Sequence, residues 1–238
     1  MSIKKEIECI IPEDRPVTGA DIVRLQEAKD QTLMDTTWEN GWYNSRYNEQ
    51  TNVLDLQNQP LTSITRALLV RAYANGLTKK IIIKQPDSLP SYGLLPTSPT
   101  FDQFHKKVAQ SIESTPKDHL PPSVHAGLKP VHTAALMGMN GNSATRWIRE
   151  DSTPNPAAQR LMTYVYSDME SRGVVALFEF LRLVNIEAKA RGLPKGLYDV
   201  LDTGKWAGTG RSRRGRPSKQ ESLDSVPKKT KAKRKPKA

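Results

Sequence analysis

The chain has 238 residues, a hydrophobic share of 37% and a formal net charge of +11, and its length allows one or two domains with a proper core. Its single cysteine, Cys9, excludes an intrachain disulfide and a cysteine-rich zinc site. No apolar run is long enough to cross a membrane and no signal peptide core is present, so we expect a protein of the cytoplasm or nucleoid without a membrane partner.

The first part of the chain, residues 1–85, is expected to form an N-terminal helical module. Thr18 is a candidate cap for one helix, and a further helix is expected over residues 61–74, closed by Asn75 and Gly76. The apolar positions at helical spacing are Ile22, Leu25 and Ala28 in the first helix and Ile64, Ala67, Leu68 and Tyr73 in the second.

The middle of the chain is rich in proline. Residues 86–130 contain eight of the seventeen prolines, and we expect residues 86–99 to be a Pro-rich linker. A helix predicted over residues 100–112 interrupts this stretch and begins a second module, which we expect to span residues 100–203. The apolar residues on one face of this helix are Phe101, Phe104, Val108 and Ile112.

Residues 129–150 predict two short helices joined by a tight turn. Pro130 suits a first helical position, where its missing N–H costs nothing, and Gly138 is typical of a helix C-terminus. Asn140 is a candidate cap for the second helix, which we expect to end near Glu150. An ordinary helical hairpin is the alternative interpretation of this pattern.

The second of these helices has one apolar face and one polar face. Ala144, Trp147 and Ile148 follow the i, i+3, i+4 spacing and are expected to be buried. The opposite face carries amide, hydroxyl and guanidinium groups, which pair with base edges in the major groove of DNA. The candidate DNA-binding residues of this helix are Asn142, Ser143, Thr145, Arg146 and Arg149.

Between Ala134 and Trp147 the chain resembles the helix-turn-helix of phage Cro and repressor proteins. The residues that carry the resemblance are Ala134, Gly138, Met139, Ala144 and Trp147. The resemblance implies a five-helix fold whose recognition helix places its N-terminal residues at the bases of double-stranded DNA. The positions that it would assign to base reading are Gly141, Asn142, Thr145 and Arg146.

Two further helices are expected after this motif. Residues 154–166 repeat the pattern of residues 60–73, since both begin with proline and end in tyrosine. Two related helix-turn-helix modules are therefore one interpretation, the first of them degenerate, and coincidence is the other. Residues 174–190 are the most apolar segment and either close the core or pack on a second chain, and we favour a homodimer.

The C-terminal residues 204–238 have the composition of a disordered basic tail. Residues 211–238 hold twelve of the 36 Lys and Arg residues and two of the 25 Asp and Glu residues, so +10 of the net charge lies here and +1 in residues 1–210. The centre of this tail resembles an AT-hook, in which arginines enter a narrow A/T minor groove. Its candidate DNA-binding residues are Arg213, Arg214, Gly215, Arg216 and Pro217.

No pattern typical of an enzyme is found. The four histidines have irregular spacings and form no H-E-x-x-H motif, and the chain has no nucleophile elbow, phosphate-binding glycine loop or dinucleotide fingerprint. We therefore expect no catalytic residues, no metal and no cofactor.

Together these features predict a mainly α, sequence-specific DNA-binding protein of bacterial, plasmid or phage type. The resemblance to Cro and repressor proteins implies a transcriptional regulator, and specifically a repressor. One alternative is a nucleoid, partition or conjugation accessory protein, in which the basic tail dominates binding. A second alternative is an RNA-binding protein that uses the same tail.

Overall fold

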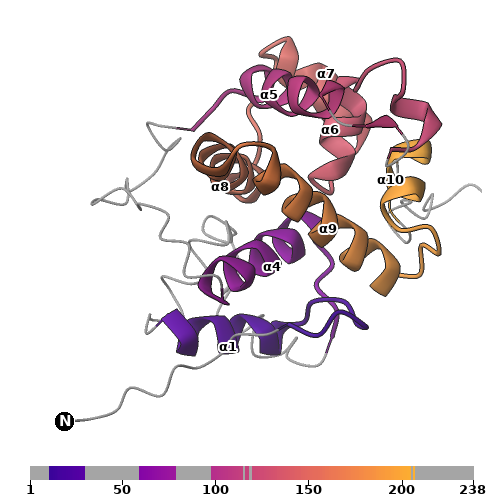
Figure 1. Cartoon of the computed structure of the whole chain (residues 1–238). Helices are drawn as coiled ribbons and strands as arrows, with labels where there is room; N and C mark the ends of the chain where they lie inside the picture. The colour runs from indigo at the N-terminus through magenta and orange to yellow at the C-terminus, as the bar shows by residue number, and fades with distance from the viewer. Residues whose placement is uncertain are drawn as a thin grey trace, which may run out of the picture. The chain divides into compact units, whose positions relative to one another are not determined.

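The computed structural model describes residues 11–29, 59–78, 98–114, 116–117, 120–204 and 206. The described part is mainly α, as predicted, and its only β contact is an isolated antiparallel bridge between Thr18 and Pro60. Its elements, shown in Figure 1, are α1 (Gly19–Lys29), α4 (Ile64–Thr78), α5 (Phe101–Glu113), the 3-10 helix η2 (Pro122–Val124), α6 (Pro130–Leu136), α7 (Gly141–Ile148), α8 (Pro156–Arg172), α9 (Val174–Ala190) and α10 (Leu197–Thr203).

Helix α4 is buried on two sides. Figure 1 shows it between α1 and the pair α8 and α9, and it contacts all three. A helix that is apolar around most of its circumference is expected in such a position. The α4 residues in the main core are Ile64, Leu68, Leu69 and Ala72, and those in a smaller cluster with Ile22 and Leu25 of α1 are Ala67, Val70 and Ala74.

The helices on the two sides of the expected linker pack into one unit. A compact unit spans Met1–Ala207, and within it α4 lies directly on α8 and α9. The Tyr164 hydroxyl of α8 donates a hydrogen bond to the carbonyl oxygen of Ala72 at 2.9 Å, and burial raises the pKa of Tyr164. The described parts of residues 1–85 and 100–203 are therefore not packed as separate modules.

Two helix ends differ from the prediction. Helix α4 continues through Asn75 and Gly76 to Thr78, so this pair does not end the helix. A Cβ atom at Gly76 would lie 2.5 Å from the hydroxyl oxygen of Tyr164, so a larger side chain would push α8 away. Helix α8 runs past Tyr166 to Arg172.

A buried network of charged groups holds α4 against α9. Glu187 is fully buried and accepts hydrogen bonds at 2.7 Å from Nε of Arg71 and at 2.7 Å from Nε of Arg191. Arg71 also donates to the carbonyl oxygens of Pro12 at 3.1 Å and Arg15 at 2.7 Å. Because a buried charge is tolerated only when it is paired and hydrogen-bonded, this network fixes the N-terminal segment to the core.

Some predictions fall on residues that are not described. Residues 86–97 of the expected linker and residues 207–238 of the expected tail lie outside the described residues. Among the helices that are described, none has both the length and the apolar character required to span a lipid bilayer.

Candidate nucleic-acid interface

Helices α6 and α7 form the predicted helical pair, and its turn has the predicted chemistry. Gly138 has φ of +75°, and the hydrogen bonds from Gly138 N to Ala135 O and from Met139 N to Ala134 O, both 2.9 Å, form a Schellman motif. Asn140 caps α7, since its side-chain oxygen accepts a bond from the backbone N–H of Ser143 at 3.2 Å. Four residues therefore turn the chain between the two helices.

The turn is docked on the first residues of α4. Oγ1 of Thr65 donates a hydrogen bond of 2.7 Å to the carbonyl oxygen of Met137. A Cβ atom at Gly138 would lie 2.7 Å from Cγ2 of Ile64 and 2.8 Å from the backbone nitrogen of Thr65. Glycine is therefore required here by its neighbours as well as by its backbone angle.

The inner face of α7 anchors it to α5. Ala144 and Trp147 are buried, as predicted, and the Trp147 ring meets the Phe101 ring edge-on with centroids 5.1 Å apart. Ile148 is 39% exposed, which corrects the prediction that it shares the buried face. Ile148 is the last residue of α7, so no further helical turn follows to cover it. Its side chain projects at the edge of the apolar stripe and not at its centre.

The outer face of α7 is polar and open. Its exposed residues are Asn142, Thr145, Arg146 and Arg149. Steps of about 100° along a helix place these four on the side opposite Ala144 and Trp147. Neither arginine forms an ion pair or side-chain hydrogen bond with any other described residue, so both guanidinium groups are available for a ligand.

Two positions at the start of α7 have structural roles. Ser143 is half-buried, and its hydroxyl lies 3.4 Å from the side-chain oxygen of Asn140, within the helix cap. Gly141 lies against α6, because a Cβ atom there would come within 2.5 Å of Cγ2 of Val131. Close helix packing accounts for this glycine.

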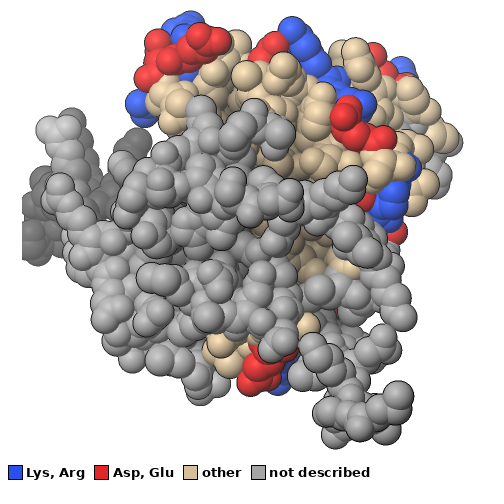
Figure 2. Space-filling view, turned by 90° about the vertical axis from the view of Figure 1, so that its left-hand side faces the viewer, with Lys and Arg blue, Asp and Glu red and all other residues tan. Residues whose placement is uncertain are grey.

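Positive charge does not dominate the described part of the face shown in Figure 2. On the face shown in Figure 2, basic and acidic side chains are intermixed along the described part, and neither sign forms a continuous field. At the end of α7, Glu150 and Asp151 directly follow Arg149. The two guanidinium groups of Arg146 and Arg149 are therefore the positive charges that an anionic ligand would meet on the outer face of α7, with two carboxylates next to them in the chain.

The histidines near this pair of helices are structural. Nδ1 of His105 lies 2.8 Å from Oγ1 of Thr133, and Nδ1 of His132 accepts the backbone N–H of Lys129 at 3.1 Å. Burial is the main cause that lowers the pKa of each imidazole. Within the described residues, no three His, Cys, Asp or Glu side chains gather in a way that could hold a metal ion.

The structure brings four of the predicted residues of α7 together on one surface and assigns the fifth, Ser143, to its cap. The tail positions Arg213, Arg214, Gly215, Arg216 and Pro217 lie outside the described residues. The contact of Thr65 with the turn was not predicted, because no local signal marks a partner 72 residues away.

Comparisons with protein-family models, with curated proteins and with solved structures found no match to this chain.

Proposed function

We propose that this protein binds double-stranded DNA in a sequence-specific manner, with α7 as the recognition helix of a Cro-like helix-turn-helix. The observation that carries the proposal is the outer face of α7, on which Asn142, Thr145, Arg146 and Arg149 are exposed. The width of a B-DNA major groove admits one α-helix, and α7 is short and polar on its free side.

The side chains on this face match the chemistry of base edges. The Arg146 guanidinium suits O6 and N7 of guanine, and the Asn142 amide suits N6 and N7 of adenine. Thr145 offers a hydroxyl and a methyl group, and the methyl group suits the C5-methyl of thymine. Arg149, one turn after Thr145, suits either a base or a backbone phosphate.

The packing of α7 favours recognition because it leaves the reading face little freedom. Trp147 fixes the helix to α5, and the turn before it is held by Thr65 and by the close approach of Gly138 to α4. A recognition surface that is fixed before binding loses less conformational entropy when it meets DNA.

The basic tail has a different part in the proposal. Residues 211–238 carry net charge +10, whereas residues 1–210 carry +1, so counterion release on binding belongs mainly to the tail. We assign to Arg214, Gly215 and Arg216 an AT-hook-like contact with A/T-rich minor grooves next to the specific site. Such a protein would reside at the nucleoid.

We further propose that the protein binds DNA as a homodimer formed through the start of α9. Val174, Val175 and Phe178 are 41%, 54% and 41% exposed, although they belong to the most apolar of the described helices. Exposed apolar side chains grouped on one helix end are typical of association surfaces. A dimer would place two copies of α7 on two half-sites, as helix-turn-helix regulators do.

The direct test is selection of bound fragments from random duplex DNA, using the full chain and a variant with Asn142, Thr145, Arg146 and Arg149 all replaced by alanine. We expect the full chain to enrich a short motif and the variant to enrich none. Enrichment of only A/T-rich DNA by both proteins would support a nucleoid or accessory role. Tighter binding of structured RNA than of any selected duplex would support the RNA-binding alternative.

The dimer has its own test in sedimentation, since the four-residue variant leaves α9 intact. A species of twice the chain mass should form at micromolar concentration and be lost on Phe178→Lys. A protein that stays at the 26.6 kDa of one chain at high concentration would refute the dimer but not the DNA-binding face.

A further inference from the structure

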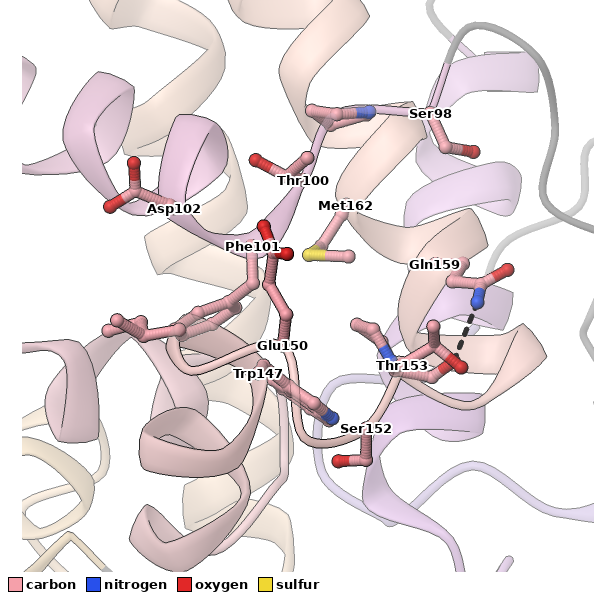
Figure 3. Close-up of a pocket in the computed structure, with 13 residues that line it drawn as sticks. Ser98, Thr100, Phe101, Asp102, Trp147, Glu150, Ser152, Thr153, Gln159 and Met162 are labelled. Atoms are coloured by element: carbon pink, nitrogen blue, oxygen red, sulfur yellow. Dashed lines mark hydrogen bonds between the residues drawn. The ribbon is translucent and has the colours of Figure 1, made fainter.

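A cavity of about 270 Å³ lies beside the recognition helix. Its walls come from the start of α5, the end of α7, the residues that follow α7, and α8. Figure 3 shows Phe101, Trp147 and Met162 around it, with the side chain of Glu150 extending from the end of α7 toward the start of α5. The contact between Trp147 and Phe101 anchors α7 to α5, and the same two residues therefore form one wall of this cavity.

The size and lining of the cavity favour an aromatic ligand. Apolar cavities of about 150 Å³ accommodate benzene, so this one has room for a molecule of two fused rings. Phe101, Trp147, Ile148 and Met162 supply aromatic and aliphatic surface. Sites for small molecules combine such surface with a few polar groups that fix the orientation of the ligand.

Most polar groups around the cavity are already satisfied. The side-chain amide of Gln159 donates to the carbonyl oxygen of Pro154 at 2.6 Å. Asp102 pairs with Lys106 at 2.7 Å. The carboxylate of Glu150 forms no hydrogen bond or ion pair with any other described residue, which leaves one negative group at the cavity without a partner.

Glu150 also has a backbone conformation that L-residues avoid. Its φ of +59° makes it the only non-glycine residue with positive φ in the described part of the chain. It occupies the position after α7 where a Schellman motif normally has glycine, with bonds from Glu150 N to Trp147 O at 3.3 Å and from Asp151 N to Arg146 O at 3.0 Å. A left-handed conformation is unfavourable for a residue other than glycine, and such strain is common at binding sites.

We propose that this cavity binds a small aromatic amine, with its rings against Phe101 and Trp147 and its cationic group at the carboxylate of Glu150. This assignment needs only the cavity and its charge, and does not depend on DNA binding.

A second part of the proposal rests on the proposed function. The ligand would neutralise Glu150, which follows Arg149 at the end of the reading face, so it would remove a negative charge that repels DNA phosphates. Occupancy should therefore raise DNA affinity, by about 5–150-fold if the coupling is of ordinary size. By reciprocity, DNA would tighten ligand binding by the same factor.

Calorimetry of the full chain measures binding of tryptamine, the cationic probe. Indole and indole-3-acetate, which have the same ring system, are the uncharged and anionic controls. We expect saturable binding of tryptamine, up to about fivefold tighter than that of indole-3-acetate, because Glu150 is exposed and an exposed opposite-charge contact contributes at most about 1 kcal/mol. Glu150→Gln should abolish that preference without changing the melting temperature. Glu170→Gln, which removes an exposed carboxylate outside the cavity, should leave it intact.

Equal binding of the three probes, no binding at millimolar concentration, or an unchanged preference in Glu150→Gln would each overturn the assignment. DNA affinity is then measured with and without tryptamine. Tight tryptamine binding with unaltered DNA affinity would overturn the coupling alone, whereas a failure to bind any DNA would refute the proposed function and leave the cavity result standing.

Discussion

Oγ1 of Thr65 donates a 2.7 Å hydrogen bond to the carbonyl oxygen of Met137, so the first turn of α4 supports the turn between α6 and α7. The bond is buried, and it satisfies a carbonyl group at the C-terminus of α6 that has no partner within its own helix. Leaving such a group unsatisfied costs about 1–3 kcal/mol. The position of α7 therefore depends on a helix that is far away in sequence.

Gly138 and Gly192 provide a matched pair for testing this docking. Both follow a helix in a Schellman motif and have positive φ, +75° and +87°, but a Cβ at Gly192 would meet nothing within 4 Å. We expect Gly192→Ala to cost about 1–2 kcal/mol from its backbone angle. Gly138→Ala should cost about 1–3 kcal/mol more, because it also overpacks Ile64 and Thr65. Equal losses of unfolding free energy in urea would contradict the docking.

Glu187 should be among the most sensitive positions for stability. It is fully buried between Arg71 and Arg191, and Glu187→Gln would leave two buried or half-buried guanidinium groups without their counter-charge. Removing one partner of a buried ion pair costs about 3–5 kcal/mol. Glu13→Gln is the control, since Glu13 pairs with Arg182 in an exposed ion pair worth about 0–1 kcal/mol. If urea unfolding shows similar losses for both variants, the buried network does not stabilise the fold.

The free energy of unfolding should decrease as the pH falls below about 6.5. Burial lowers the pKa of both His105 and His132, with Lys106 and Lys129 acting in the same direction and Asp102 opposing the shift of His105. The unfolded chain therefore binds protons at a higher pH than the folded chain. The contribution of the neutral imidazoles to the free energy of unfolding is fully present above the pKa of histidine in the unfolded chain, and it is lost as the pH falls toward the lowered pKa values of the folded chain. His105→Gln, which keeps a hydrogen-bonding group near Thr133, should flatten urea-derived stability between about pH 8 and about pH 5.5. An unaltered profile in this variant would exclude His105 as a cause.

Local sequence rules predicted the parts of this structure that depend on local chemistry. The spacing of Phe101, Phe104, Val108 and Ile112 predicted α5 and its buried face, and Asn140 predicted the start of α7. Gly138 predicted the end of α6 because the Schellman motif is completed within a few residues. The four exposed positions of α7 followed from helical phase alone.

Features that depend on distant contacts were not predictable in this way. Helix α4 packs on two sides, so its apolar residues show no single stripe, and the packing of Gly76 against Tyr164 was interpreted as a helix end. Ile148 was misplaced because helical phase does not show where neighbouring helices stop. The cavity at Glu150 arises where three helices meet, and no short pattern in the chain indicates it.

Deleting residues 211–238 should lower affinity for every DNA sequence. The deletion removes net charge +10 from a chain whose remainder carries +1. The slope of log affinity against log salt should become shallower by about 0.9 for each phosphate contact that is lost. Salt titration on a selected and a random duplex measures this, and an unchanged slope would mean that the tail does not contact the DNA backbone.

The central claim, that α7 reads DNA sequence, is tested most directly by Arg146→Ala, with Arg182→Ala as the control. Both variants remove one exposed arginine, but Arg182 lies on α9 and pairs with Glu13. Affinity is measured for the selected duplex and for a random duplex at one salt concentration. We expect Arg146→Ala to lose about 1–3 kcal/mol of discrimination between the two while affinity for the random duplex stays nearly constant. Arg182→Ala should keep the discrimination of the unaltered chain. If Arg146→Ala weakens both duplexes equally, or if Arg182→Ala behaves like it, α7 is not the element that reads the sequence.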